Sequence, residues 1–400
     1  MNIGIFTDTY LPQINGVVSS IVTLERQLRK QGHQVYIFTV SHPKAPANEE
    51  DVYRIPSMPF VFLKDYRVGL MYSSRLMYRI KRLKLDIILS QTEFSLGMFA
   101  RLTGMRLHIP VVHTYHTMYE EYMHYISKGV EFSPELARKY SKKFCNHVDG
   151  VIAPTQKTKQ LLLGYGVQTP IEVIPSGIDF SPFDKINYDK EVIDNLKNSL
   201  GLNTTDPIIL FVGRVAKEKS IDEILYALPR VIQHLPTTKL VIIGDGPEMA
   251  TLKTLAMHLG IEKNISFLGM KPWQEIGKYY QLGDIFVSAS TSETQGLTFA
   301  EAMAASLPVI AKVDDSTKDL IIQGYNGCFF DSKASLETAL ITCLEDTNYR
   351  NTLAEHAKDS IAPLSDELFG QNAVAYYQYI LSISSKLKNR KKDKKVRPSA

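Results

Sequence analysis

The sequence predicts an α/β fold built from two doubly wound domains with a crevice between them. Three observations support this prediction. Short apolar runs rich in β-branched residues alternate with segments of helical period along the whole chain, a pattern typical of parallel sheets covered by helices on both faces. The chain has 400 residues, of which 44% are hydrophobic, so it can form two cores of ordinary domain size. Twelve candidate strands also fit two such sheets better than one.

The first domain is predicted to occupy residues 1–180. Each of its strands is a continuous apolar run, as in "NIGIFTD", which is the pattern of a strand buried on both faces. The six strands are expected at residues 2–8, 34–40, 85–91, 109–115, 149–155 and 171–177.

The polar segment 181–206 is predicted to be a linker, and a second domain is expected at 207–365. Residues 366–387 are predicted to form a helix that returns to the first domain, followed by a basic disordered tail at 388–400. The strands of the second domain are expected at residues 207–213, 239–246, 264–269, 284–290, 308–312 and 328–330.

Composition disfavours several classes of protein. No apolar window of about 18 residues is present, and the N-terminal "MNIGIFTDTY" lacks the basic start and apolar run of a signal peptide. We therefore expect the protein to stay in the cytosol. The cysteines Cys145, Cys328 and Cys343 are scattered and show no metal-ligand spacing, so neither a disulfide framework nor a metal site is predicted. The pattern G-x-G-x-x-G is missing after the first strand, which disfavours a hydride-transfer enzyme.

Positive charge is concentrated in two segments. The net charge of the chain is +4, whereas residues 386–397 alone carry +7 and residues 64–84 carry +6, which leaves −9 on the remainder. Local basic patches on an otherwise acidic protein favour an anionic surface as a partner.

Ligands of open α/β sheets bind outside the carboxyl ends of the strands, so polar residues that follow each strand are candidates for the site. In the first domain, the Asn15-Gly16 turn opens a helix whose amides and dipole can bind an anion or a sugar. Taken alone, such a glycine is more often structural, serving only the geometry of the turn. His113 and His116 lie at the end of strand 109–115. A histidine there can hydrogen-bond a sugar hydroxyl or polarise a reacting group, or it can simply cap a helix or pack in the core.

Two strand ends of the second domain carry charged residues. Arg214 follows strand 207–213, and Lys219 lies five residues further on. This pair can hold both phosphates of a diphosphate, although two solvated surface charges would show the same pattern.

The segment "TSETQGLTFAEAMA", residues 291–304, follows strand 284–290. The amides of Gly296 and Leu297 at the start of the next helix form a candidate anion site. Glu293 precedes them in a polar loop. Glu301 lies inside the helix, where its carboxylate can accept hydrogen bonds from a diol such as ribose.

Taken together, these motifs resemble those of the retaining GT-B glycosyltransferases of family 4. The resemblance spans residues 1–380 and is carried by Asn15-Gly16, "HTYHT", "IPSGID", "GRVAKEK", "GDGP" and the E-x7-E of "SETQGLTFAEAMA". It implies two Rossmann-like domains and hexosyl transfer from a nucleotide sugar, without a metal ion or other cofactor. One departure is Ser176, where the family usually has asparagine.

The resemblance also implies roles for the second-domain residues. Arg214 and Lys219 would hold the diphosphate of the donor, helped by the amides of Gly296 and Leu297. Glu301 would bind the ribose.

Three further roles follow from the same resemblance. Glu293 would contact hydroxyls of the donor sugar. Gly16 would lie against the diphosphate and the sugar, and His116 would reach the sugar near the reacting centre. Glu293 and His116 are thus the candidate catalytic residues.

The basic segment 64–84 bears on the acceptor. Treated as a helix, it places Arg75, Arg79 and Arg82 on one face beside an apolar face, with Tyr72 close by. Such a helix can lie in a membrane interface, or it can pack its apolar face on the sheet. The basic tail is a second signal for anionic lipid, or else a solubilising or nucleic-acid-binding tail.

Residues 113–129, "HTYHTMYEEYMHYISKG", together with segment 64–84 resemble the bacterial 1,2-diacylglycerol 3-glucosyltransferases. This narrower resemblance implies UDP-glucose as donor, diacylglycerol as acceptor, and α-monoglucosyldiacylglycerol as product, used in glycolipid and lipoteichoic acid anchor synthesis. It implies a peripheral protein on the cytoplasmic face of the cell membrane, with an anionic membrane surface and no nucleic acid as partner. Tyr119 would line the acceptor entrance. The alternatives are a soluble family 4 enzyme with a water-soluble acceptor, and a non-catalytic membrane- or RNA-binding protein.

Overall fold

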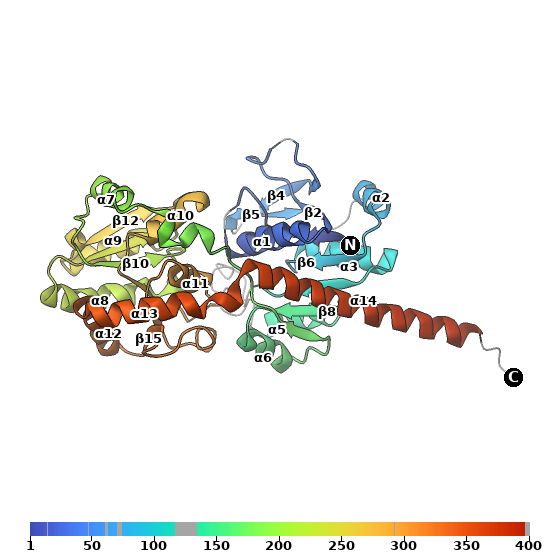
Figure 1. The fold of residues 1–400 in the computed structure, drawn as a ribbon. Coiled ribbons are helices and arrows are strands. Elements are labelled where there is room, and N and C mark those ends of the chain that lie inside the picture. Colours follow the sequence, from blue (N-terminus) through green and yellow to red (C-terminus); the bar gives the residue numbers. More distant parts are fainter. Residues whose placement is uncertain are drawn as a thin grey trace. The chain divides into compact units, whose positions relative to one another are not determined.

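The structure is a computed structural model of the 400-residue chain. The residues that it describes are 1–13, 15–46, 48–60, 63–69, 74–116, 134–291 and 293–396. The chain divides into two compact units (Figure 1). Unit 1 comprises Met1–Gly177 and Asp366–Ala400, and unit 2 comprises Ile178–Ser365.

Unit 1 contains a seven-stranded sheet in the order β3-β2-β1-β6-β7-β8-β9, in which all neighbours pair in parallel. The six predicted strands are present. The edge strand β3 was not predicted, because three of its four residues are only partly buried and it lacks a continuous apolar run. The strands are β1 (Asn2–Phe6), β2 (Gln34–Val40), β3 (Val52–Ile55), β6 (Ile87–Ser90), β7 (Val111–Thr114), β8 (Gly150–Ala153) and β9 (Ile171–Val173).

Helices cover both faces of this sheet. On one face, α1 (Gly16–Lys30) and α14 (Asp366–Val396) lie side by side and share a core with β1 and β2 (Figure 1). The other face is covered by α2 (Ser74–Leu83), α3 (Ser95–Leu107), α5 (Pro134–Cys145) and α6 (Gln156–Gly164).

Unit 2 contains a six-stranded parallel sheet in the order β12-β11-β10-β13-β14-β15, and all six strands were predicted. Its helices α8 (Ile221–His234), α9 (Met249–His258) and α12 (Lys333–Glu345) cover one face. The opposite face carries α7 (Lys190–Ser199), α10 (Ile276–Tyr280) and α11 (Leu297–Ala304), while α13 (Thr347–Ser360) contributes to both cores. The strands are β10 (Ile208–Val212), β11 (Lys239–Ile243), β12 (Ile265–Gly269), β13 (Ile285–Ser288), β14 (Val309–Lys312) and β15 (Gly327–Phe330).

The segment predicted as a linker, 181–206, is an integral part of unit 2. It forms two short 3₁₀ turns and helix α7. Phe183, Ile193 and Leu202 are buried in the core of the unit. These isolated apolar residues in a polar stretch anchor the segment to the sheet, because each removes its side chain from water.

Two further segments differ from the prediction. Residues 64–69, the start of the segment 64–84 that was treated as a helix, lie in strand β5 (Leu63–Gly69), which pairs in antiparallel fashion with β4 (Ser57–Phe60). Within the described part of that segment, the helix is Ser74–Leu83. At the C-terminal end, α14 continues to Val396, through most of the tail predicted to be disordered. No glycine or proline interrupts residues 371–396, and Lys and Arg are good helix formers.

Each sheet has a topological switch point, where chain connections leave one strand in two directions. In unit 1 it lies between β1 and β6, and in unit 2 between β10 and β13. Ligands of doubly wound folds bind beyond the carboxyl ends of the strands at such points. The loops that follow these four strands are therefore where a site is expected.

Candidate functional site

The loop after β10 is fixed by close backbone packing against the loop after β11. A Cβ on Gly244 would lie 1.8 Å from the Gly213 carbonyl oxygen, and a Cβ on Gly246 would lie 2.2 Å from that of Val215. The Val215 amide donates a hydrogen bond to the Asp245 carbonyl at 3.0 Å. The "GDGP" glycines thus allow two backbones to approach more closely than any side chain would permit, which positions the loop that carries Arg214 and Lys219.

Lys219 and Glu293 come together at the switch point of unit 2. Lys219 ends a 3₁₀ turn after β10, and Glu293 lies in the loop after β13. The Lys219 ammonium donates to the Glu293 carboxylate at 2.5 Å, and their side chains are only 16% and 14% exposed. Arg214 lies in the same loop and is exposed. A carboxylate and two cations therefore follow adjacent strands.

Gly296 starts helix α11 from the left-handed region, with φ of 73°. Its Cα approaches the Phe299 ring so closely that a Cβ would lie 2.7 Å from Phe299 Cδ2. Leu297 is the first residue of the helix, so its amide lies at the positive end of the helix dipole. Both residues thus occupy the place that an anion cradle requires.

Glu301 is buried within α11, with 5% of the residue exposed. The Tyr280 hydroxyl donates to Glu301 Oε2 at 2.6 Å. Burial raises the pKa of Glu301 to about 7, and the hydrogen bond from Tyr280 opposes this rise. Its charge therefore changes near neutral pH.

Gly16 is the first residue of α1 in unit 1. Asn15 caps this helix, because its side-chain oxygen accepts a hydrogen bond from the Val18 amide at 3.0 Å. The Asn15 amide nitrogen also donates to Thr9 Oγ1 at 3.1 Å. The cap ties the loop after β1 to the start of the helix.

His116 lies just beyond the end of β7 and is half-buried. Its Nε2 is 2.7 Å from Gln91 Oε1. Burial lowers the pKa of His116 to about 3, with a smaller contribution from the charge of His113. The His116 ring is therefore neutral at physiological pH.

His113 is fully buried and has two partners. Its Nδ1 lies 3.0 Å from the Ser90 carbonyl, and its Nε2 lies 3.1 Å from Glu93 Oε1. The predicted alternative of a core histidine therefore describes His113.

Three polar residues that were not predicted from the sequence are buried at the switch point of unit 1: Asp8, Gln91 and Glu93. Asp8 accepts hydrogen bonds from the side chains of Thr92 and Ser95 and from the Leu96 amide, so it links the end of β1 to the start of α3. Burial raises the pKa of Asp8. All three residues follow apolar strands, a signal that could have identified them.

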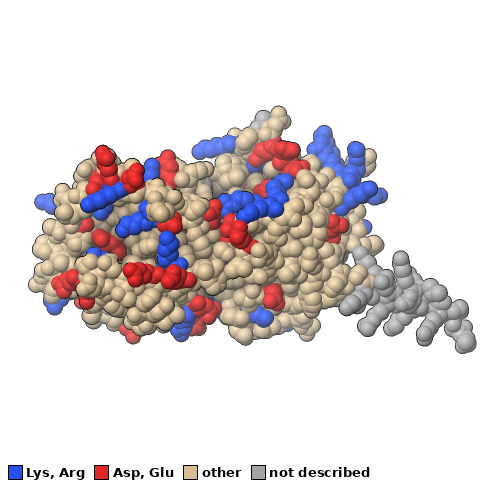
Figure 2. Space-filling model, in the orientation of Figure 1, with Lys and Arg blue, Asp and Glu red and all other residues tan. Residues whose placement is uncertain are grey.

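The arginines of α2 are exposed, whereas its apolar face is not. Arg75, Arg79 and Arg82 point to solvent, and basic side chains cluster over α2 in Figure 2. Leu76 and Ile80 are buried in the core beneath the helix. The alternative in which the apolar face packs on the sheet is thus correct, and that face is not available to enter a bilayer. The predicted contact residues Tyr72 and Tyr119 lie outside the described residues.

The predicted residues are divided between the units. Unit 1 holds Gly16, His116 and the α2 arginines, and unit 2 holds Arg214, Lys219, Glu293, Gly296, Leu297 and Glu301.

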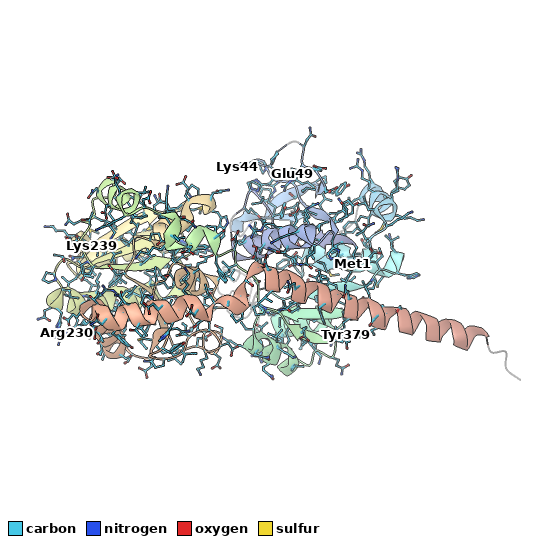
Figure 3. All side chains as sticks on the ribbon, in the orientation of Figure 1. Met1, Lys44, Glu49, Arg230, Lys239 and Tyr379 are labelled. Carbon is cyan, nitrogen blue, oxygen red and sulfur yellow. The ribbon has the colours of Figure 1, made fainter. Side chains whose placement is uncertain are left out.

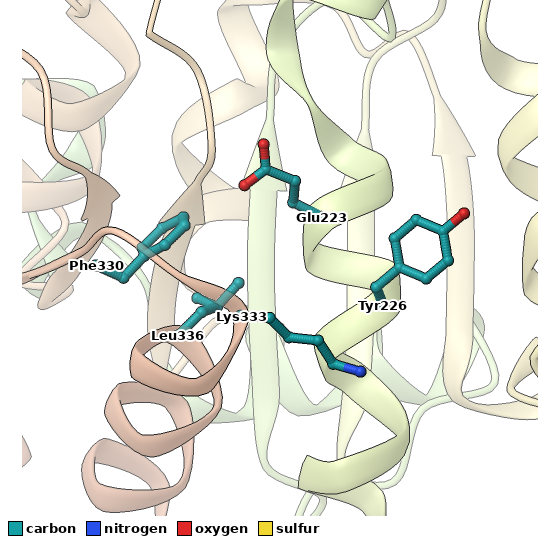
Figure 4. A pocket seen from close by; sticks show the side chains of 5 residues that line it. All are labelled: Glu223, Tyr226, Phe330, Lys333 and Leu336. Atoms are coloured by element: carbon teal, nitrogen blue, oxygen red, sulfur yellow. The ribbon is translucent and has the colours of Figure 1, made fainter.

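A partly open pocket of about 210 Å³ is lined by residues of α8, β15 and α12 and contains none of these residues (Figure 4). In the described part of the chain, no group of three or more His, Cys, Asp or Glu residues is arranged to hold a metal ion. Nor does any described helix combine the length and apolarity needed to cross a membrane.

Comparison with known proteins identifies the family. Residues 14–181 match the family model Glycosyltransferase Family 4, and residues 192–360 match Glycosyl transferases group 1. The chain is 39% identical to the alpha-monoglucosyldiacylglycerol synthase of Streptococcus pneumoniae over 94% of this chain and 85% of that protein. It is 36% identical to the synthase of the same name from Acholeplasma laidlawii, over 98% of this chain and 100% of that protein.

Solved structures share the fold. Anabaena Alr3699/HepE in complex with UDP and glucose superposes with a TM-score of 0.77 at 18% identity, covering 95% of this chain and 100% of that one. Sucrose-phosphate synthase from Thermosynechococcus elongatus gives a TM-score of 0.74 at 19% identity, covering 96% of this chain and 99% of that one. Two Rossmann-like units of parallel sheet and helix agree with this GT-B fold. The chain therefore belongs to the family 4 glycosyltransferases, and it is a nucleotide-sugar-dependent hexosyltransferase.

Proposed function

We propose that this enzyme transfers glucose from UDP-glucose to the 3-hydroxyl of 1,2-diacylglycerol, with retention, to give α-monoglucosyldiacylglycerol. The observation that carries the proposal is 36–39% identity to two alpha-monoglucosyldiacylglycerol synthases over at least 94% of the chain. The donor is supported by HepE, which has the same fold and was solved with UDP-glucose.

The strand ends of unit 2 suit a nucleotide diphosphate. The bond to the anomeric carbon breaks as negative charge develops on the leaving diphosphate, and fixed cations and amides stabilise that charge. Arg214 and Lys219 would supply the cations, and the amides of Gly296 and Leu297 would supply the helix dipole. This chemistry does not call for a metal ion.

The two glutamates would bind the sugars of the donor. Glu301 would accept hydrogen bonds from the ribose hydroxyls, since the Tyr280 contact engages only Oε2 among the described contacts. Glu293 would accept hydrogen bonds from the glucose hydroxyls while the Lys219 ammonium orients its carboxylate.

His116 would act as a hydrogen-bond partner of the glucose, and not as a proton carrier. Its ring is neutral, with a pKa of about 3, so it does not deliver a proton at neutral pH. In a same-face attack, the leaving phosphate would itself take the proton of the acceptor hydroxyl.

The acceptor is a membrane lipid, so the enzyme would have to dock on a bilayer. We propose that Arg75, Arg79 and Arg82 bind an anionic membrane surface, each contributing about 1 kcal/mol. Their guanidinium groups are exposed on α2. The enzyme would then be peripheral, on the cytoplasmic face of the membrane.

The proposal is tested by glucose transfer from labelled UDP-glucose to diacylglycerol in vesicles with anionic or zwitterionic lipid. The same assay is run with water-soluble sugar acceptors in the absence of lipid. Product confined to the diacylglycerol samples, and greater with anionic lipid, is expected. Product from a soluble acceptor alone would instead favour the soluble family 4 alternative.

A further inference from the structure

Gln91 has an unusual environment at the carboxyl end of β6, beside the switch point of unit 1. It is 2% exposed. Its Oε1 lies 2.7 Å from His116 Nε2. Its amide nitrogen, in contrast, is buried and has no hydrogen-bond partner in the part of the chain that the structure describes.

Two other buried polar residues at the strand ends of unit 1 are paired. Asp8 is held by Ser95 and Leu96, and His113 is held by Ser90 and Glu93. A buried amide N–H without a partner costs about 1–3 kcal/mol. Such a group suggests a function that offsets the cost.

The Gln91 carbonyl also determines the tautomer of His116. Because an amide oxygen only accepts hydrogen bonds, His116 Nε2 must carry the hydrogen. The ring is neutral, so Nδ1 keeps its lone pair and can only accept. This strand end therefore offers one acceptor, His116 Nδ1, and one donor, the Gln91 amide nitrogen, on either side of the hydrogen bond that joins the two side chains.

Hydroxyl groups of a ligand match both atoms, since one hydroxyl can donate to His116 Nδ1 and a different one can accept from the Gln91 amide. We propose that Gln91 is a positioning and ligand-binding residue of the transfer reaction. It holds His116 in the Nε2–H tautomer, and its amide N–H donates to a hydroxyl oxygen of the bound ligand. The ligand rests on the proposed function: the hydroxyl belongs either to the glucose of the donor or to the glycerol of the acceptor.

The tautomer is tested without any activity measurement. Nitrogen chemical shifts of labelled histidine, with His116 assigned by its loss in His116→Asn, should show Nε2–H in the unchanged protein. In Gln91→Leu, the His116 signals should become those of a mixture of tautomers. An Nδ1–H tautomer in the unchanged protein would overturn the proposal, whatever the acceptor of the enzyme is.

The functional part is tested by comparing stability with kinetics in Gln91→Leu. Gln91→Leu removes the unpaired amide N–H, which is a gain in stability, and the acceptor of His116 Nε2–H, which is a loss, so the Tm should change little. The kcat/KM for UDP-glucose should fall roughly tenfold to a hundredfold. The control is Gln27→Leu, because Gln27 is equally buried but donates to Asp366. The Gln27→Leu variant should have a lower Tm and an unchanged kcat/KM. A Gln91→Leu protein with lower Tm and unchanged kcat/KM would show a structural role and contradict the proposal.

The source of the hydroxyl is identified from the side-chain amide signal of Gln91, assigned by its loss in Gln91→Leu. A shift with UDP-glucose and none with UDP would assign the contact to the donor glucose. A shift with micellar dioctanoylglycerol would assign it to the acceptor. No shift with any of the three, in a sample that forms product, would exclude ligand contact by Gln91. A sample that makes no glucosyl-lipid but shows the UDP-glucose shift would contradict the proposed acceptor and leave the role of Gln91 in place.

Discussion

Lys219 Nζ lies 2.5 Å from Glu293 Oε1, across 74 residues of sequence, and joins the loop after β10 to the loop after β13. The ion pair puts a cation proposed for the diphosphate in contact with a carboxylate proposed for the sugar. We therefore expect a change at either residue to affect the binding of both the diphosphate and the sugar of the donor.

Lys219→Ala should lower kcat/KM for the donor by roughly a hundredfold to a thousandfold, because it removes a phosphate cation and leaves Glu293 charged beside the diphosphate. Glu293→Gln should lower kcat/KM by a smaller factor. The double variant should be less impaired than the two single losses combined, as measured by steady-state kinetics of all four proteins. Lys217→Ala, in the same turn, is the control, and a comparable loss from it would argue against a specific role for Lys219.

Gly296→Ala should impair both folding and donor binding. The positive φ costs an alanine about 1 kcal/mol, and the added Cβ would also meet Phe299. Gly201→Ala is a matched control, since Gly201 has a φ of 71° but nothing within 4 Å of its Cβ position. Chemical denaturation should show a larger loss for Gly296→Ala, with a raised KM for UDP-glucose in that variant only. Equal losses and equal KM values would contradict the assignment.

Donor binding should depend on pH through Glu301. Ribose hydroxyls donate to a carboxylate, so binding should favour the ionised form and weaken as pH falls below about 7. Calorimetry in buffers of different ionisation enthalpy should detect proton release on binding of UDP-glucose. Glu301→Gln should abolish the release.

Glu301 should also make the stability of the protein depend on pH. The folded-state pKa of Glu301 lies above its usual value of 4.5, so the folded protein binds the proton more tightly. The free energy of unfolding should therefore decrease as pH rises from 4.5 to 7. Tyr280→Phe removes a hydrogen bond that lowers the pKa, and it should move the midpoint of proton release upward. A downward shift would show that Tyr280 does not stabilise the carboxylate.

His116 should contribute no ionisation to kcat between pH 5 and 9, because burial holds its pKa at about 3. His116→Asn, which keeps a hydrogen-bonding side chain, should retain more activity than His116→Ala. Both are measured as kcat against pH in saturating donor. If His116→Asn removed a limb of the profile near pH 6.5, the histidine would be a proton carrier after all.

Membrane binding should depend on α2. Replacing Arg75, Arg79 and Arg82 by glutamine should weaken sedimentation with anionic vesicles by roughly a hundredfold, at about 1 kcal/mol per residue. The control replaces three exposed basic residues of unit 2, namely Lys190, Arg230 and Lys263 (Arg230 is labelled in Figure 3). Similar weakening by both triple variants would indicate a general charge effect.

The fold could be predicted largely because its strands are buried on both faces and so appear as continuous apolar runs. Strand β3 and the β4–β5 pair lack such runs and were missed. Segment 181–206 was wrongly predicted to be a linker because only a few apolar residues, such as Phe183, connect it to the core.

The candidate site could be located by a topological rule, since its residues follow strands that meet at a switch point. The side-chain contacts between these residues could not be predicted. Lys219 with Glu293, and Tyr280 with Glu301, are pairs that depend on which strands become neighbours. Gln91 belongs to no motif, and only its buried, unpaired amide distinguishes it.

The last helix, α14, packs its Phe369, Ala373 and Tyr377 against the core that α1 shares with β1 and β2. These residues are synthesised nearly 200 residues later than the rest of that core, which ends at Ile174. The continuous segment Ile178–Ser365 is complete before them. Because domains generally fold as units, unit 2 can fold before unit 1 is complete, which reverses the usual N-terminal-first order. The N-terminal half must meanwhile wait with an apolar surface uncovered, which makes it the part of the nascent chain most in need of a chaperone.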